Sequence, residues 1–361
     1  MTRGIVHGIR PRGVAGGMPA WLSGAAVNEW IAISGTTHAG SAGDPTSDGR
    51  STSRLAYSGA GLVGAELVLA ACGGHGDYSG NEVTSIDLSQ DSPTWTLRLA
   101  RTASVTADVA YYGDGRPSSR HTYWSTHYST TRSRLMLHRS RFVYGSAVSF
   151  NDSNGFNLGT NAWDADGTWA DGSTPGCRDA YDNVWAFTNS QHSIRKWTAA
   201  TDTWSSDLGT WGSETLGYPL AHDTSRDKLF ALSIGNGEGG GSGVSAHRFA
   251  MDGATRDTIT FSASSAYTQF QSDAGIHAGM DYVPALDKFL WYSGAGSTAR
   301  VYAITPNGGT TWDMAILSVT GVTPATVQGS GIFNRFRYVS SLRGCVCMGS
   351  GAANVNFVRL H

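Results

Sequence analysis

The sequence predicts an all-β protein folded as a six-bladed β-propeller. Glycine supplies 47 of the 361 residues, nearly double its ordinary usage, which indicates many turns and few long helices. No stretch keeps a hydrophobic period of 3.6 over a dozen residues, whereas short alternating apolar runs recur along the whole chain. A turn motif that occurs six times gives the number of blades.

The repeated motif starts with an aromatic residue or a histidine at the end of one strand. Four or five turn residues follow, then a charged or polar residue, then an alternating apolar run. Four copies are clear, a shortened one lies at 180–187 and a looser one at 53–74; the clear copies are 127–138, 222–232, 281–292 and 337–348. Their mean spacing is near the roughly 50 residues of a four-stranded propeller repeat. The second strands should therefore begin near Leu67, Leu135, Val184, Leu229, Phe289 and Gly344.

Tryptophans are expected to mark the outermost strands, because Trp95, Trp204 and Trp312 each close a unit. The stretch 305–312 (TPNGGTTW) resembles the Asp-box turn of sialidase-like propellers, with Asn307 where aspartate is usual. It predicts a tight turn that leads into an outermost strand.

The last unit offers only three strands, and 28–35 (NEWIAISG) is predicted to be its missing outer strand. This pairing would close the ring and cover edges that otherwise invite aggregation. We expect residues 1–27 to form an N-terminal arm and residues 28–361 the propeller. A pair of β-sandwiches is the alternative, but it would not explain the repeated motif.

One segment resembles a known repeat. Gly73 and Gly74 follow an apolar strand, another strand comes next (NEVTSIDL), and Trp95 closes the unit. These features look like a kelch repeat, and 116–124 (RPSSRHTYW) resembles the start of the next one. More narrowly, 73–83 (GGHGDYSGNEV) is similar to a variant in kelch-like proteins encoded by bacteriophages and high-GC bacteria.

The match covers residues 54–124, and later units lack the double glycine. Kelch propellers include binding modules and enzymes such as galactose oxidase, so the resemblance leaves the function open.

The charge balance argues against nucleic acid and anionic membranes as partners, since the net charge is −2 and charged residues make up only 15%. No apolar run approaches the roughly 18 residues of a membrane span, so no membrane insertion is expected. Arginine greatly outnumbers lysine, which occurs only as Lys196, Lys228 and Lys288. Codon bias in a GC-rich genome explains this, and selection for planar, bidentate anion contacts is the alternative.

The four cysteines are expected to be free thiols, because no CxxC or Cys/His ligand spacing surrounds Cys72, Cys177, Cys345 or Cys347. We therefore predict no metal site and no cofactor. The first 24 residues lack the apolar run of a signal peptide, which predicts a soluble product. The resemblance to phage-encoded kelch-like proteins implies that it is made in the cytoplasm of a host and carried in a virion. Residence in the cytoplasm, or export by another route, is the alternative.

Two sets of loops share one face of a propeller: those that lead into the innermost strands, and those between the second and third strands. Together they supply the predicted ligand-binding residues His75, Asp77, Tyr78, Asn81, Arg120, His121, Arg178, Asp179, His277 and Arg335. Arg54, His192 and the loop 235–243 belong to the same sets. Glycines in 71–88 would let the backbone approach a ligand.

Each of these residues also has a structural explanation. Asp77 and Asn81 can bond to the backbone of their own loop, His75 can be a structural donor, and the arginines can bridge blades through carbonyls and carboxylates. A cluster of arginines near the axis of the propeller needs neutralisation, either by acids such as Asp77, Asp179 and Asp281 or by an anionic ligand.

The expected function is non-enzymatic: a virion-associated or surface-exposed module, such as a tail or fibre protein, for assembly or receptor and glycan binding. Its partners would be other virion or surface proteins and host glycan. The alternative is an enzyme on acidic polysaccharide. A lyase would use His75 or His121 with Arg120 and Tyr78; a glycosidase would use two carboxylates, for which Asp77 and Asp179 are candidates. A metal held by His75, His121 and His277 would need ligands from different blades.

Overall fold

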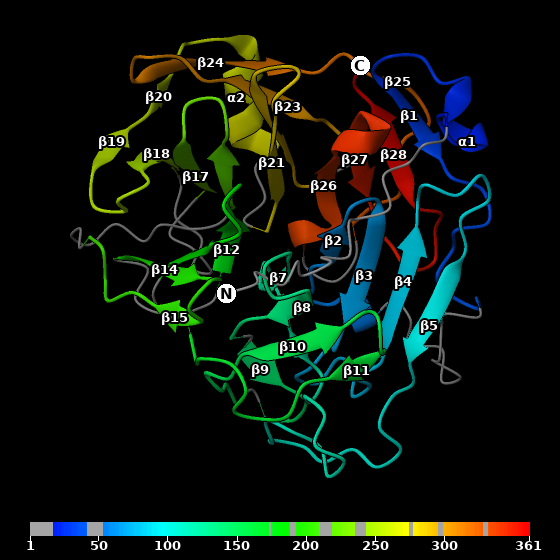
Figure 1. Ribbon diagram of the computed structural model, residues 1–361. Coiled ribbons are helices and arrows are strands. Elements are labelled where there is room, and N and C mark those ends of the chain that lie inside the picture. The colour runs from blue at the N-terminus through cyan, green and yellow to red at the C-terminus, as the bar shows by residue number, and fades with distance from the viewer. Residues whose placement is uncertain are drawn as a thin grey trace, which may run out of the picture.

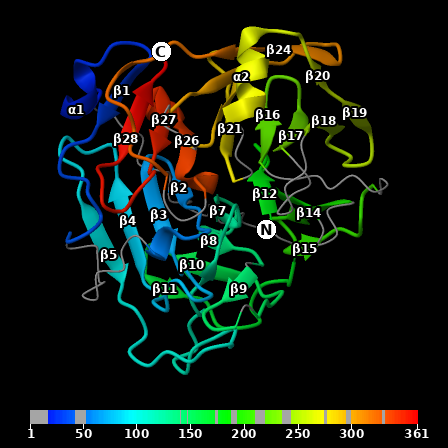
Figure 2. The ribbon, with the colours of Figure 1, turned by 180° about the vertical axis from the view of Figure 1, so that it is seen from behind.

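In the computed structural model, the described residues are 17–41, 53–139, 141–146, 148–172, 175–187, 193–209, 219–234, 243–273, 277–294, 299–327 and 331–361. Over these residues the strands form six sheets of four or five strands and one sheet of two strands. The six larger sheets surround a common centre, and each sheet has one of its two end strands nearest to it (Figures 1 and 2). The protein is a six-bladed β-propeller, as the sequence predicts.

Blades 1 to 3 follow one another along the chain, each running from the centre outward. Blade 1 comprises β2 (Gly61–Val63), β3 (Glu66–Ala70), β4 (Val83–Asp87) and β5 (Trp95–Leu99). Blade 2 comprises β7 (Thr126–Ser129), β8 (Arg134–Leu137), β10 (Asn154–Asn157) and β11 (Ala162–Trp163). Blade 3 comprises β12 (Pro175–Arg178), β13 (Val184–Phe187), β14 (Ile194–Thr198) and β15 (Thr203–Trp204).

Blades 4 to 6 complete the ring. Blade 4 comprises β16 (Leu220–Asp223), β17 (Lys228–Ile234), β18 (Val244–Ala250) and β19 (Arg256–Thr258). Blade 5 comprises β21 (Gly279–Val283), β22 (Lys288–Tyr292), β23 (Tyr302–Thr305), β24 (Thr311–Ile316) and an added edge strand, β20 (Thr260–Phe261). Blade 6 comprises β26 (Phe336–Val339), β27 (Gly344–Cys347), β28 (Asn356–Arg359), β1 (Glu29–Ala32) and an added edge strand, β25 (Thr320–Gly321).

The repeated turn motif positions the second strands, each of which begins within one residue of its predicted start. The residue just before the second strand adopts a left-handed conformation in four blades: Ser133, Asp227, Asp287 and Arg343, with φ between 51° and 57°. Such a residue ends a tight turn and lets the next strand fold back, and short polar side chains tolerate this backbone well. The motif is therefore local turn chemistry, which is why it can be read from the sequence.

The N-terminal strand closes the ring. β1 pairs antiparallel with β28, with Trp30 opposite Val358 and Ile31 opposite Phe357. The Trp30 side chain is buried, and its ring centroid lies 6.0 Å from that of Tyr292 in blade 5. The predicted closure is confirmed. The parallel edge strands β25 and β20, which lie outside β1 and β24, are not predicted by the sequence.

The predicted N-terminal arm is described only from residue 17 onward, and residues 1–16 lie outside the described part. α1 (Ala20–Ser23) directs Leu22 into the core between blades 6 and 1, where it is fully buried. The indole nitrogen of Trp21 donates hydrogen bonds to the carbonyl oxygens of Leu88 and Gln90, at 3.2 and 3.1 Å. This short stretch therefore packs directly on blade 1.

Aromatic side chains fill the spaces between blades. Phe230 of blade 4 lies 4.7 Å from Phe289 and 4.8 Å from Trp312 of blade 5, centroid to centroid. α2 (Ser265–Asp273) places Phe270 against the same blade, 4.8 Å from Trp291. None of the described helices is long and apolar enough to cross a membrane.

Two further sequence predictions concern the outer strands and the cysteines. Trp95, Trp204, Trp312 and Trp30 all lie in the strand that completes the antiparallel part of a blade, as predicted. The Asp-box-like turn precedes β24, where the Asn307 side chain accepts a hydrogen bond from the Gly309 nitrogen at 2.8 Å. All four cysteines are free and buried, as expected.

Candidate functional site

Loops from blades 1, 2, 5 and 6 meet on one face of the propeller and form a cluster of histidines, aromatic rings and one carboxylate. The segments before β2, β7, β21 and β26 contribute, as do the loop between β3 and β4 and the pair β6 (Arg120–His121) and β9 (Arg141–Val143). We call this group the axial cluster; its members are Tyr57, His75, Asp77, His121, Tyr123, Trp124, Phe142, His277 and Phe333.

The double glycine explains how the first loop reaches the cluster. β6 and β9 pair in a two-stranded sheet that packs against Gly74, whose φ is +74°. A Cβ at this position would lie 2.4 Å from Arg120 Cα and 2.5 Å from the Phe142 carbonyl oxygen, distances that no side chain can occupy. The loop is held there because the His75 nitrogen donates to the carbonyl oxygens of Phe142 and Val143, both at 3.1 Å.

Replacing Gly74 by alanine should therefore destabilise the protein by about 2–3 kcal/mol, the range for a strained backbone position with an added steric clash. The matched control is Gly76→Ala, since a Cβ at Gly76 meets nothing within 4 Å. Urea unfolding of both variants measures the difference. Equal midpoints for the two variants would contradict the close approach of backbone that we describe.

His121 lies at the centre of the cluster and is almost fully buried. Its Nε2 lies 3.1 Å from Asp77 Oδ2, and its Nδ1 lies 3.3 Å from the Tyr123 hydroxyl oxygen. The Tyr57 ring stacks on the imidazole with centroids 4.5 Å apart. These contacts fix both the position and the rotation of the ring.

Burial lowers the pKa of His121 to about 4, although the hydrogen bond to Asp77 acts in the opposite direction. The imidazole is therefore neutral at pH 7. A neutral imidazole carries one N–H, and a carboxylate can only accept, so Nε2 donates to Asp77 and Nδ1 accepts from the Tyr123 hydroxyl.

The remaining members surround this centre. The ring centroid of His75 lies 5.9 Å from that of His121, and the centroid of Phe142 lies 5.5 Å from it. His277 contacts the other side, with centroids 5.7 Å from Tyr57 and 5.0 Å from Phe333. His75 is exposed, and Tyr57, Asp77, Phe142 and His277 are half-buried, so this part of the cluster meets solvent.

Five members of the cluster have left-handed backbone, with φ between 43° and 52°: Tyr57, His75, Tyr123, Phe142 and Phe333. Bulky residues rarely adopt this conformation, and each instance costs about 1–3 kcal/mol unless the surroundings impose it. Strained positions of this kind gather at functional sites. This observation makes the axial cluster a candidate site on stronger grounds than any single side chain does.

The structure brings together four of the predicted ligand-binding residues, His75, Asp77, His121 and His277. Tyr78 and Asn81, from the same loop, point instead into the interior, and each is 1% exposed. The Asn81 amide nitrogen donates to Thr102 Oγ1 at 3.0 Å and to the Pro117 carbonyl oxygen at 2.8 Å, so it fixes the neighbouring segment. Burial raises the pKa of Tyr78 above its usual range.

The predicted arginines have structural partners. Arg120 is fully buried and pairs with Asp152 Oδ2 at 2.6 Å. Arg335, also fully buried, donates to the carbonyl oxygens of Ser58 at 2.8 Å and Met348 at 3.0 Å, which joins blades 6 and 1. These two side chains bridge buried groups, because backbone carbonyl oxygens surround each guanidinium and Arg120 also pairs with a carboxylate.

The other charged candidates also lie apart from the axial cluster. Arg178 donates to the Tyr128 carbonyl oxygen and lies 3.5 Å from Asp182. Asp179 accepts from the Asn183 nitrogen and from the Trp185 indole, both at 2.8 Å, and so holds its own turn together. The other two acids that were expected to neutralise the predicted arginines have different partners. Asp281 pairs with Arg337 at 2.9 Å, and Asp77 pairs with His121. His192 and residues 235–242 lie outside the described residues.

Sequence reasoning missed the aromatic half of the site, namely Tyr57, Tyr123, Trp124, Phe142 and Phe333. Tyr123 and Trp124 follow His121 two and three residues later, so aromatic residues close to a loop histidine were the available signal. Phe142 lies on β9, an insertion between the second and third strands of blade 2 that the repeat pattern does not include.

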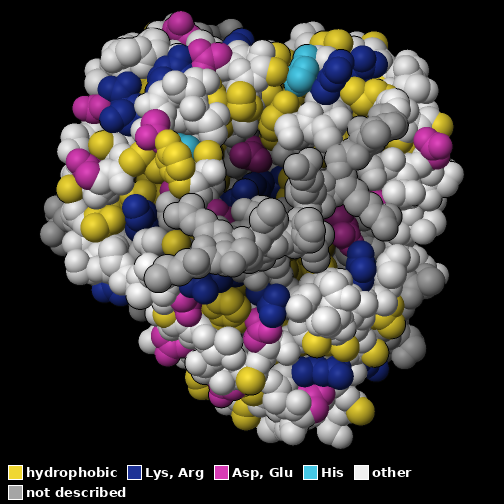
Figure 3. All heavy atoms as spheres, viewed as in Figure 1, with side chains coloured by type: hydrophobic (Ala, Val, Ile, Leu, Met, Phe, Trp, Pro, Cys, Tyr) yellow, Lys and Arg dark blue, Asp and Glu magenta, His cyan; other side chains and the backbone are white. Residues whose placement is uncertain are grey.

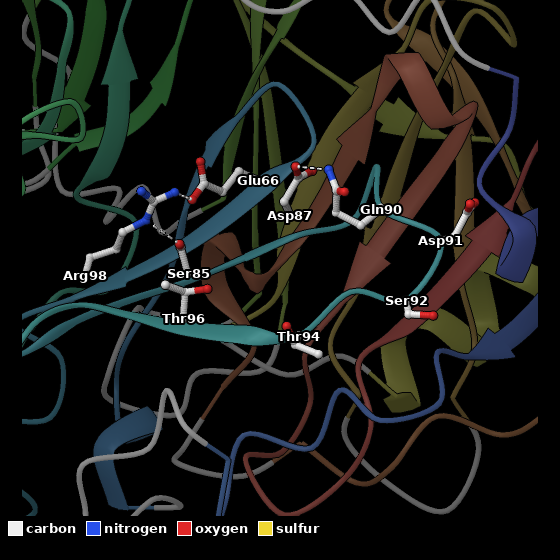
Figure 4. Close-up of a pocket in the computed structure, with 9 residues that line it drawn as sticks. All are labelled: Glu66, Ser85, Asp87, Gln90, Asp91, Ser92, Thr94, Thr96 and Arg98. Atoms are coloured by element: carbon white, nitrogen blue, oxygen red, sulfur yellow. Dashed lines mark hydrogen bonds and ion pairs between the residues drawn. The ribbon is translucent and has the colours of Figure 1, made fainter.

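A separate polar hollow lies on the outer part of blade 1 (Figure 4). Arg98 points toward Glu66 and Ser85, and Asp87 points toward Gln90. The Arg98 guanidinium pairs with the Glu66 carboxylate. Acidic and basic side chains also gather in a depression at the centre of the face shown in Figure 3.

Comparison with known proteins finds matches among solved structures and none among family models or curated proteins. No family model matches the sequence, and no curated protein matches it. Among solved structures, the chain is similar to YjhT, with 8% identity and a TM-score of 0.42, over 73% of this chain and 97% of that one. It is also similar to YCF48 bound to D1 peptide, with 12% identity and a TM-score of 0.43, over 95% of this chain and 99% of that one.

Proposed function

We propose that the protein is a non-enzymatic binding module that recognises a glycan through the axial cluster, as a virion-associated or surface-exposed propeller. The propeller fold is compatible with a binding module. The observation that carries the proposal is the partly exposed set of Tyr57, Phe142 and His277 beside the polar groups of His75 and Asp77. Aromatic faces pack against the apolar face of a sugar ring, and a few convergent polar groups bond to its hydroxyls.

The cluster is also rigid, which suits recognition. His121 is fixed on three sides, and left-handed backbone at Tyr57 and His75 is imposed by the packed loops around them. A preorganised surface loses little conformational entropy when it binds a ligand, so modest contacts give useful affinity.

The competing proposal is elimination on a uronate polymer, and two of the side chains that it requires are buried. It needs Arg120 to hold the substrate carboxylate and Tyr78 to move a proton, and these side chains are 0% and 1% exposed. The glycosidase version pairs Asp77 with Asp179, and Asp179 is 2% exposed and bonded within its own turn. These placements favour binding over catalysis.

The test is a panel of neutral and acidic oligosaccharides, measured by calorimetry with the intact protein. We expect Tyr57→Ala to weaken binding of the best ligand by roughly 3–10-fold, as for loss of one aromatic contact. The control is Tyr181→Ala, because Tyr181 is 63% exposed and lies in a turn of blade 3. Equal affinity of Tyr57→Ala and the parent would overturn the assignment of the site.

The same incubations distinguish the alternatives. An unsaturated product released from a uronate polymer, seen as new ultraviolet absorbance, would establish the lyase instead. Co-sedimentation of the protein with purified virus particles tests the virion-associated part of the proposal.

A further inference from the structure

We propose that His75, Asp77 and His121 form a binding site for a divalent transition metal of the zinc type. One ligand atom from each of the three residues lies within 4.8 Å of the other two. The inference goes beyond glycan recognition, because it concerns a metal ion that can be tested without any sugar present.

The donor set determines the class of metal. Two imidazoles and one carboxylate suit zinc and its first-row neighbours, whereas calcium and magnesium prefer sites made wholly of oxygen. Three protein ligands also leave a further position open, as in zinc sites that bind an exogenous ligand. Here that position would face solvent, since His75 is exposed and Asp77 is half-buried.

The geometry needs little adjustment. Two ligands each about 2.0–2.1 Å from a tetrahedral ion are roughly 3.3 Å from each other. His121 Nε2 and Asp77 Oδ2 are 3.1 Å apart, so this pair already has the required separation. His75 must move closer. Its side chain is exposed and its ring already lies beside that of His121, so a change in its side-chain torsion angles would bring a ring nitrogen toward the pair while hydrogen bonds to β9 hold its backbone.

The surroundings of His121 match those of a metal-binding imidazole. Such a ligand commonly donates its second ring N–H to an oxygen, which fixes its orientation and raises its basicity. When a metal replaces the proton on Nε2, the proton moves to Nδ1, which then donates to the Tyr123 hydroxyl oxygen 3.3 Å away. Stacking of Tyr57 keeps the ring in this plane.

The chain contains a comparison pair that lacks the third ligand. His222 Nε2 lies 3.1 Å from Asp227 Oδ1, the same separation as in His121–Asp77. No third histidine, cysteine or acidic residue among the described residues joins this second pair in a potential metal cluster. Asp227→Asn is therefore the matched control for Asp77→Asn.

The experiment uses tag-free protein, stripped with chelator and dialysed, and titrated with zinc chloride alone in a calorimeter. We expect one zinc ion per chain. Asp77→Asn and His75→Ala should each weaken zinc binding at least tenfold, and Asp227→Asn should leave it unchanged. His75 is exposed and Asp77 is half-buried, so both variants should fold, which circular dichroism verifies. Tyr123→Phe, a positioning variant, should weaken zinc binding roughly tenfold with an unchanged stoichiometry.

The proposal is overturned if the parent protein binds zinc no more tightly than about 100 µM, near −5.5 kcal/mol. It is also overturned if His75→Ala and Asp77→Asn bind zinc as the parent does. Because no sugar is present, failure here leaves the glycan proposal intact, and absence of glycan binding leaves the zinc result intact.

Discussion

Deletion of residues 1–35 should unfold the protein at temperatures where the parent is folded. The deletion removes β1 and with it Trp30 and Ile33, which are 2% and 1% exposed, as well as Leu22, which is fully buried. Loss of one large core side chain typically costs 3–5 kcal/mol, and the stability of a domain is only about 5–15 kcal/mol. The deletion also leaves the outer edge of β28 without a partner.

Thermal melting followed by circular dichroism measures this effect. The control is deletion of residues 1–16, which leaves α1 and β1 in place and should preserve the parental melting temperature. The melting temperature of the point variant Trp30→Ala should lie between those of the two deletion variants. A 1–35 deletion that melts with the parent would show that β1 is not the strand that closes blade 6.

Replacing Arg54 by methionine should lower the free energy of unfolding by about 3–5 kcal/mol, because it leaves a buried carboxylate without its partner. Arg54 Nε lies 3.1 Å from Glu82 Oε1, and both side chains are 0% exposed. The guanidinium also contacts His38 Nε2 at 3.0 Å, so it links the segment after β1 to blade 1.

The double variant Arg54→Met/Glu82→Leu should regain much of this loss, since a buried ion pair can be replaced by apolar residues at little net cost. Arg195 and Asp207 provide the surface control, with side chains 40% and 43% exposed. Asp207→Asn should change stability by less than about 1 kcal/mol. If chemical denaturation gives Arg54→Met and Asp207→Asn the same free energy of unfolding, the buried ion pair contributes no more to stability than the exposed one.

The parts of the fold that the sequence predicts depend on local chemistry. Ser133, Asp227 and Asp287 end turns that need a left-handed residue, so the starts of the second strands could be placed. The strand that contains Trp30 has no neighbouring strand in the sequence with which to pair, and this indicated that it closes the ring by pairing with the last blade. The added strands β20 and β25 could not be predicted, because each is two residues long and carries no periodic pattern.

The site could be predicted only in part. His75 and Asp77 stood out within a glycine-rich loop, but Tyr57 and Phe333 join them through contacts between blades that no local pattern encodes. The arginines show the opposite problem. Arg335 bonds to backbone carbonyls, which leave no mark in the sequence, so a buried structural arginine and one that binds a ligand look the same there.

Closure by β1 also sets an order of events during synthesis. β1 leaves the ribosome before every other described strand, yet its antiparallel partner β28 is made only after the other five blades. Trp30 must therefore remain outside its final packing while most of the chain folds, although it belongs to the interior of the finished ring. Pairing across such a sequence separation is slow, because the loop must close before its contacts form. The nascent chain thus carries an exposed aromatic strand until translation reaches blade 6, and at that stage it is most vulnerable to pairing with the wrong partner.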